Sequence, residues 1–318
     1  MAPNDKVRSN SFSATMGIFG ILFLLVIANT VFGQQKSAAE HVQKGNELVS
    51  SGQPDKAIGE FSKAIMFEPG NAFAYLQRGI ARGMTGQMRK AVEDFNKAIE
   101  LDPKVPEAFF SRAMANERMN ETDQAIEDYG KAIELNPNYA EAYHNRGTQY
   151  HKKGLFNLAI DDFKKAIFLQ QNYAKAYFNL GVAYRSISDT TMALRSYTEA
   201  IDIDPKFIDA YYNRGLALYD KEDYKSAIKD FQKILDLDST HAHAWFNLGA
   251  TLEIDKQYGK ALDSYKKYTL YAPFPERDKV EALEKRFPDI ERKMQGRPNP
   301  KLPPDFDMKP ADSMGAGK

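Results

Sequence analysis

The sequence predicts an all-α fold in which helical hairpins repeat along the chain and stack into one elongated body. Three observations carry this prediction. Apolar residues recur at helical spacing, polar breaks separate the helices in pairs, and the whole pattern returns every 34 residues. Because stacked repeats contact mainly their neighbours, this short period predicts an array rather than the two ordinary domains that 318 residues could hold.

The clearest copy of the repeated module lies between Ala174 and Pro205. Its first apolar stripe has the spacing of one helix face, at Tyr177, Leu180, Gly181 and Tyr184. A polar break at 186–190 follows, and a second helical stripe comes after it, at Ala193, Leu194, Tyr197, Ala200 and Ile201. Small residues leave room for two helices to approach, and Pro205 ends the second helix because proline cannot continue it. The module is therefore predicted to be a helical hairpin.

The chain begins with a polar stretch that carries Lys6 and Arg8, followed by an apolar run over 16–28. This order is typical of a secretory signal sequence, with small residues before Gln34 at a cleavage site. Counted to Phe32, the run also reaches the lower limit of the ~17–25 residues that span a bilayer. Two interpretations of residues 1–33 stay open, a cleaved signal peptide or an N-terminal membrane anchor. Both place the rest of the chain outside the cytoplasm, as a periplasmic or secreted protein or as a membrane-anchored one.

The 34-residue period runs without insertion or deletion and divides the chain into seven repeats: 38–71, 72–105, 106–139, 140–173, 174–207, 208–241 and 242–275. Every copy has Ala at its twentieth position and an aromatic residue four positions later, as in Ala193 and Tyr197. The eighth position is Gly in every copy except the third, which has Ala113. Such regularity indicates one structural unit copied along the chain.

This pattern resembles the tetratricopeptide repeat, whose signature is an aromatic residue, Leu, Gly and an aromatic residue, then Ala, an aromatic residue, Ala and Pro. The resemblance covers residues 38 to about 275. It implies a right-handed superhelical solenoid of helix-turn-helix hairpins with a C-terminal capping helix, in which the first helix of each hairpin lines a concave groove. Departures from the signature affect local packing, at Ala113, Gln171, Ile234, Ser239 and Tyr268.

Both ends of the array have their own signals. Ser37 and Glu40 have the spacing of a capping box, so we expect the first helix to start near residue 38. After the last repeat, residues 276–295 resemble the family's terminal capping helix, with Pro288 interrupting it. Residues 296–318 are rich in Pro and Gly and poor in apolar residues, which predicts a disordered tail.

The resemblance places repeat positions 2, 5, 6, 9, 12 and 13 in the groove. Position 6 forms an Asn ladder in the last four repeats, at Asn145, Asn179, Asn213 and Asn247. Position 5 beside it carries mainly aromatic side chains, at Phe110, His144, Phe178, Tyr212 and Phe246. An Asn amide can pair with both the C=O and the N–H of an extended backbone, so these rows predict a peptide-binding groove. The alternative is that the Asn side chains brace neighbouring helices and that the rings fill space between repeats.

Composition and motifs narrow the function. A formal net charge of zero does not favour nucleic acid as a partner, and the absence of cysteine excludes thiolate nucleophiles and Cys-type metal sites. His144 and His151 lie ~10 Å apart on one helix, too far to share a metal ion. No phosphate loop, nucleophile elbow or pair of carboxylates interrupts the repeats. We therefore expect no enzymatic activity, no cofactor and no metal.

The predicted function is a non-catalytic scaffold, exported or membrane-anchored, that binds a peptide segment of a partner protein in its concave groove. The alternative is a structural assembly component of an envelope or membrane complex that oligomerises through its convex face or repeat edges. The expected partner is thus a protein or peptide, and membrane contact is expected only through residues 1–33. The sequence sets neither the identity of that partner nor the oligomeric state.

Overall fold

The computed structural model describes residues 36–296, which are all-α and contain no strand. The all-α fold of tandem helical hairpins predicted above is confirmed. The predicted N-terminal segment, 1–33, and nearly all of the predicted tail, 296–318, lie outside the described residues. Within 36–296, no helix combines the length and the apolar character needed to cross a bilayer. The chain divides into two compact units, 1–142 and 143–318, and each is taken in turn.

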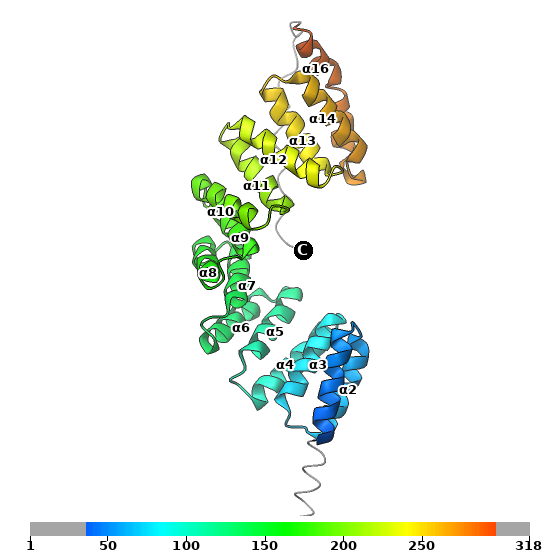
Figure 1. The fold of residues 1–318 in the computed structure, drawn as a ribbon, viewed down its shortest axis with the longest axis vertical. Helices are drawn as coiled ribbons and strands as arrows, with labels where there is room; N and C mark the ends of the chain where they lie inside the picture. Colours follow the sequence, from blue (N-terminus) through cyan, green and yellow to red (C-terminus); the bar gives the residue numbers. More distant parts are fainter. Residues whose placement is uncertain (1–35, 297–318) are drawn as a thin grey trace, which may run out of the picture. The chain divides into compact units, whose positions relative to one another are not determined.

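The first unit consists of helical hairpins in which each helix packs against the next along the chain (Figure 1). Its helices are 36–50, α2 (Pro54–Phe67), α3 (Ala72–Met84), α4 (Met88–Leu101), α5 (Pro106–Arg118) and α6 (Thr122–Leu135). The capping box expected at its start is wrong, because Lys36 and Ser37 are already helical. A side-chain cap needs non-helical backbone, so Ser37 cannot provide one.

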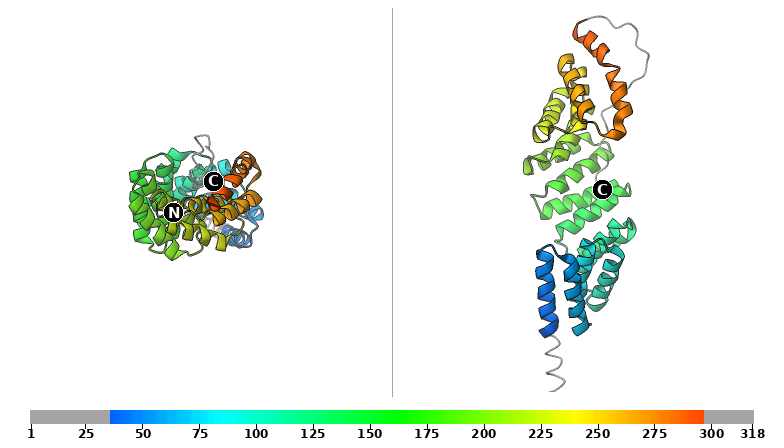
Figure 2. Two further views of the ribbon diagram at one scale, coloured as in Figure 1. Left: turned by 90° about the horizontal axis from the view of Figure 1, so that it is seen from above. Right: turned by 90° about the vertical axis from the view of Figure 1, so that its right-hand side faces the viewer.

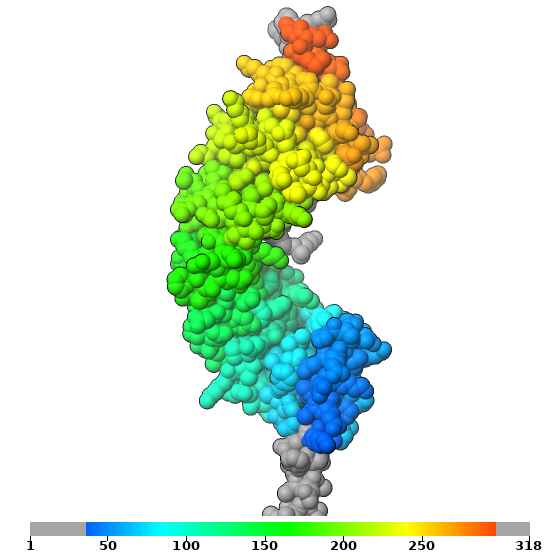
Figure 3. Space-filling view, in the orientation of Figure 1, coloured from blue at the N-terminus to red at the C-terminus, as the bar shows by residue number. Residues whose placement is uncertain are grey.

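The second unit continues the same hairpins, which Figure 3 shows in contact along its length. Its elements are α7 (Ala140–Lys152), whose first turn contains the division between the units, α8 (Phe156–Leu169), α9 (Ala174–Ser186), α10 (Thr190–Ile203), α11 (Ile208–Asp220), α12 (Tyr224–Leu237), α13 (Ala242–Ile254), α14 (Tyr258–Tyr271), η1 (Phe274–Glu276), α15 (Arg277–Glu284) and α16 (Phe287–Met294). In both units the first helix of a hairpin has 13 residues and the second has 14.

A small residue facing a ring closes each hairpin. A Cβ added to Gly181 would lie 2.6 Å from the Tyr197 ring, and one added to Gly79 would lie 2.5 Å from the Phe95 ring. Ala193, at the twentieth position, is fully buried, as are its equivalents in the other repeats. The signature residues therefore form the core because only small side chains let the two helices approach this closely.

The turn inside each hairpin passes through one residue with left-handed backbone. Glycine occupies this position at Gly52, Gly86 and Gly154. The other repeats place a residue with a side chain there, at Asn120, Ser188, Glu222 and Lys256, with φ of 61–62°. The polar break predicted at 186–190 is this turn. Left-handed backbone ends a helix by satisfying its last carbonyl groups, but it is strained for any residue except glycine.

Two short helices cover the end of the second unit, α15 and α16, shown in orange in Figure 2. Leu283 and Ile290 are 2% and 1% exposed, because they pack on the core of the last hairpins. Pro288 lies in the first turn of α16, where its missing N–H removes no helical hydrogen bond, so it starts this helix instead of interrupting one. Glu253 of α13 pairs with Arg286 at 3.3 Å and with Lys293 at 2.8 Å, which adds ionic contacts to this cover.

Candidate peptide-binding surfaces

In the second unit, the predicted Asn and aromatic rows contact each other. Asn247 Nδ2 donates to Tyr212 Oη at 3.0 Å, and Asn179 Nδ2 lies 2.9 Å from His144 Nε2. Both contacts join position 6 of one repeat to position 5 of the repeat before it. His144 Nδ1 lies 3.0 Å from Asn145 Oδ1, so one tautomer, protonated at Nδ1, satisfies both neighbours of this ring.

Burial increases along this row toward the C-terminus. His144, Asn145, Phe178 and Asn179 are half-buried, whereas Asn213 is 7% exposed and Asn247 is 0% exposed. Asn213 cannot bond to Phe178 and instead donates to the Asp209 carbonyl at 2.9 Å. The last two members of the ladder therefore face the protein interior, and only the half-buried members can reach a ligand in this structure.

The predicted aromatic side chains also make internal ring contacts. In the second unit, Phe178 lies 5.0 Å from Phe207 and Phe246 lies 5.1 Å from Tyr268, measured between ring centroids. In the first unit, Phe110 stacks on Tyr139 at 4.7 Å. Each ring thus fills space beside its own hairpin, and Phe110 belongs to a different unit from the other members of its row.

The first unit has an open apolar hollow that sequence reasoning did not single out. It has a volume of about 230 Å³, and its walls come from α3, α4 and α5. The lining includes Ile80, Gly83, Met84, Met88, Met114 and Arg118. Met84 is 53% exposed and Met114 is 38% exposed.

The hollow has a simple origin in the sequence. Its apolar lining occupies groove-facing repeat positions, namely 9 in Ile80 and Met114 and 13 in Met84. At position 12, Gly83 is the one copy without a side chain, since the others are Val49, Glu117, His151, Arg185, Tyr219 and Glu253. A Cβ added to Gly83 would meet nothing within 4 Å. Comparing position 12 across the copies is the signal that could have located the hollow.

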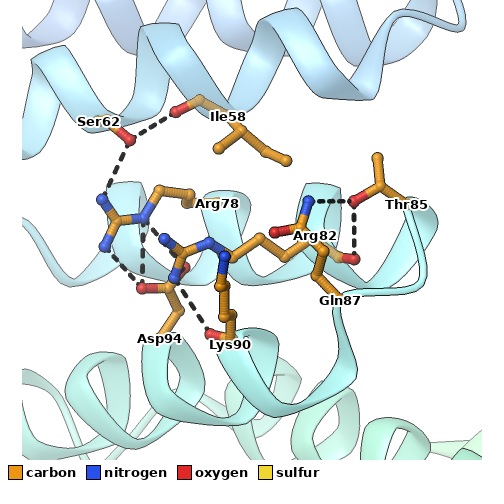
Figure 4. Close-up of polar contacts among 8 residues, drawn as sticks. All are labelled: Ile58, Ser62, Arg78, Arg82, Thr85, Gln87, Lys90 and Asp94. Atoms are coloured by element: carbon orange, nitrogen blue, oxygen red, sulfur yellow. Dashed lines mark hydrogen bonds and ion pairs between the residues drawn. The ribbon is translucent and has the colours of Figure 1, made fainter.

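Buried ion pairs cross-link the hairpins (Figure 4). Arg78 Nη2 donates to Asp94 Oδ1 at 2.7 Å, and Arg78 Nη1 donates to Ser62 Oγ of the preceding hairpin at 3.1 Å. Arg82 Nη1 donates to the other oxygen of Asp94 at 2.8 Å. Asp94 is 3% exposed and fully paired, so this cluster has the character of a structural brace rather than of a reactive site.

The same brace recurs in the other repeats with Arg at position 7 and Asp at position 23, as in Arg112–Asp128, Arg146–Asp162 and Arg214–Asp230. The hydrogen bond to Asp162 raises the pKa of Arg146. Repeats five and seven have Leu and Ser at these positions, at Leu180, Ser196, Leu248 and Ser264. This pairing depends on two residues 16 apart, and the packing signature does not contain it.

The histidines outside the row have structural partners as well. His241 accepts from the Ala244 N–H at 3.1 Å as the cap of α13, and His243 Nε2 lies 3.0 Å from Glu276 Oε1. His151 Nε2 lies 3.0 Å from Ser186 Oγ. Burial lowers the pKa of both His151 and His241, so the neutral forms predominate at pH 7.

Family models match this geometry over more than half of the chain. A model described as TPR repeat matches residues 118–154, 147–188 and 183–221, and models described as tetratricopeptide repeat match 74–105, 208–241 and 231–263. The chain belongs to the tetratricopeptide repeat (TPR) family. No curated protein matches its sequence.

Solved TPR structures are similar to this chain. The MamA protein is 27% identical, with a TM-score of 0.50, over 54% of this chain and 93% of its own. YrrB, whose structure is described as that of a TPR protein with an unusual peptide-binding site, is 26% identical, with a TM-score of 0.51, over 57% of this chain and 94% of its own. The C-terminal part of a TPR repeat-containing protein from Cytophaga hutchinsonii is 19% identical, with a TM-score of 0.62, over 73% of this chain and 96% of its own, and shares the fold.

TPR proteins are generally non-catalytic scaffolds. The family and these neighbours assign the chain to the protein-interaction scaffolds.

Proposed function

We propose that this chain binds a peptide segment of a partner protein on its groove-facing helices and catalyses no reaction itself. The observation that carries the proposal is the open apolar hollow of the first unit, which lies on groove-facing repeat positions. Apolar surface hollowed to receive a side chain is a common feature of peptide-recognition sites. YrrB, a TPR protein of 26% identity described as having an unusual peptide-binding site, supports the same interpretation.

The half-buried residues of the second unit form a second contact region in this proposal. Phe178 and Asn179 keep part of their surface exposed, and the Asn179 amide has bonding capacity beyond its one contact to His144. Asn213 and Asn247 act as braces, since their side chains are buried. We further propose that the protein works outside the cytoplasm, exported or anchored by residues 1–33, because that segment has the order of a signal sequence.

Site-specific photo-crosslinking in the native host tests the peptide proposal. A photoreactive amino acid replaces Ser111 in the hollow, Phe178 in the second unit, or Phe168, which is 75% exposed and outside both regions. The expected result is that Ser111 and Phe178 link to one short stretch of one partner, while Phe168 does not. Equal labelling from all three positions, or links scattered over the partner's folded surface, contradicts peptide binding.

A further inference from the structure

We propose that the hollow between α3, α4 and α5 takes one large apolar side chain from an acidic peptide segment and that Arg118 pairs with a carboxylate beside it. This inference rests on the proposed function and specifies its ligand. It concerns the first unit alone, whose residues supply every wall of the hollow.

The size of the hollow selects a side chain over a metabolite. Small-molecule sites enclose ~300–1,000 Å³, and about 230 Å³ falls below that range. The hollow also presents little polar surface to orient a metabolite, because Ser111 and Arg118 are the polar side chains in its lining. One Leu, Met or Phe side chain matches both the volume and the apolar walls.

The walls are chemically suited to accept more than one apolar side chain. Met84, Met88 and Met114 each carry an unbranched, polarizable thioether that can change rotamer to fit a ligand. Ile80 supplies a fixed apolar surface, and Gly83 leaves the space above it open. The hollow therefore selects for apolar character and size more than for one shape.

The charge around the hollow selects an acidic neighbour. Arg118 is exposed at the lining, and its contact within the described residues is with the Gly83 carbonyl, at a long 3.5 Å. Arg89 and Lys90 are also exposed, and they line an adjoining hollow that shares Met88. None of these three cations makes an ion pair within residues 36–296.

The nearest acidic groups do not cancel this charge. Glu117, beside Arg118, accepts from Tyr129 Oη at 2.8 Å within its own hairpin. Asp94 is occupied by Arg78 and Arg82. The cations at the hollow are thus available to a ligand, and a carboxylate one or two residues from the anchoring side chain can form a charge-assisted hydrogen bond with Arg118.

Peptide selection on the full chain tests this inference. A random peptide library displayed on phage is selected on the immobilised protein, and enriched peptides are resynthesised with a fluorescent label for anisotropy titration. We expect them to share a Leu, Met or Phe with an Asp or Glu close by. Gly83→Leu should weaken their binding at least tenfold, because the added side chain fills the hollow without meeting other atoms.

Two variants make the result specific. Gly59→Leu is the matched control, since Gly59 also lies within a helix and a Cβ added there also meets nothing within 4 Å, but it is outside the hollow; binding should stay unchanged. Arg118→Glu should weaken binding about tenfold and should bind better to a peptide in which Lys replaces the acidic residues. Circular dichroism confirms that each variant is folded.

The outcomes separate this inference from the proposed function. Peptides that bind wild type and Gly83→Leu equally overturn the inference while peptide binding itself stands. Enriched peptides without acidic residues, or an unchanged affinity in Arg118→Glu, overturn the charge pairing. If no peptide is enriched over beads without protein, the proposed function fails and the inference fails with it.

Discussion

The hollow of the first unit and the row of the second unit use equivalent repeat positions in opposite ways. In the second unit, position 6 reaches back to position 5 of the preceding repeat, as Asn247 does to Tyr212, and the groove-facing side chains satisfy one another. In the first unit, Ile80, Met84 and Met114 line a hollow, because Gly83 sends no side chain across it. A groove-facing position is therefore a brace or a binding surface according to whether its neighbours can reach it.

This difference has an energetic counterpart. A buried, hydrogen-bonded Asn contributes to stability, and its loss leaves a polar partner without its bond. A side chain that lines an open hollow contributes little, because few atoms surround it. Substitutions at matched positions should separate the two roles, and the following predictions run from the largest expected effect to the smallest.

Two glycines on α3 give the sharpest contrast. Gly79→Leu should lower the free energy of unfolding of the first unit by about 3 kcal/mol, since its Cβ alone would lie 2.5 Å from the Phe95 ring. Gly83→Leu, one helical turn later, should raise it by up to about 1 kcal/mol through helix propensity. Hydrogen exchange of the first unit measures both. Similar costs for the two variants would show that Gly83 is also a packing residue.

The ladder should divide by burial. Asn247→Ala should cost about 2 kcal/mol, because Asn247 is 0% exposed and bonded to Tyr212, whereas Asn145→Ala should cost no more than about 0.5 kcal/mol. The urea midpoint followed by Trp245 fluorescence measures this in the second unit, since Trp245 is the single tryptophan of the chain. Equal costs would mean that the ladder is a uniform brace.

The hydroxyl groups of two core tyrosines should have opposite effects on stability. Tyr197 Oη is buried without a hydrogen-bond partner, and burial raises the pKa of Tyr197. Tyr265 Oη donates to Glu253 at 3.1 Å. Tyr197→Phe should therefore stabilise the second unit by about 1 kcal/mol, and Tyr265→Phe should destabilise it by a similar amount. The same urea titration applies, and destabilisation by Tyr197→Phe would contradict the assignment.

The hairpin turns give the smallest effect. Glu222→Gly and Lys256→Gly should each stabilise the second unit by about 0.5 kcal/mol, since both residues have φ of 62° and glycine adopts that backbone without strain. Gly154→Ala, at the equivalent turn of the same unit, should have the opposite sign. Melting temperatures of the three variants check this, and a loss of stability in Lys256→Gly would show that its side chain matters more than the strain.

Sequence reasoning located the hairpins because their core depends on local spacing. The pairing of Gly181 with Tyr197 is set by two residues 16 apart in one hairpin, and every copy repeats it. The same reasoning did not find the Arg78–Asp94 brace or the left-handed turn at Glu222, although both have fixed places in the repeat. Neither feature depends on apolar periodicity, which is the pattern that reveals the helices.

The peptide-binding site was predicted less well than the fold, for a physical reason. The ladder was a sound pattern, but the exposure of each Asn depends on what position 5 of the preceding repeat offers, such as Tyr212 for Asn247 and Phe178 for Asn213. The role of the ladder as peptide ligands stays a prediction for Asn145 and Asn179. The hollow was missed because it arises from an absent side chain at Gly83, which no signature position records.

The sequence by itself determined the all-α fold, the length of the repeat and the small and aromatic residues that close each hairpin, because these depend on helical spacing within one module. Only the tertiary structure decided which groove-facing side chains are buried, which are paired and where an apolar hollow stays open. Those properties arise between neighbouring hairpins, where contacts join residues about 35 positions apart, as in Asn179 and His144. A one-residue difference such as Gly83 then changes the surface without changing the fold.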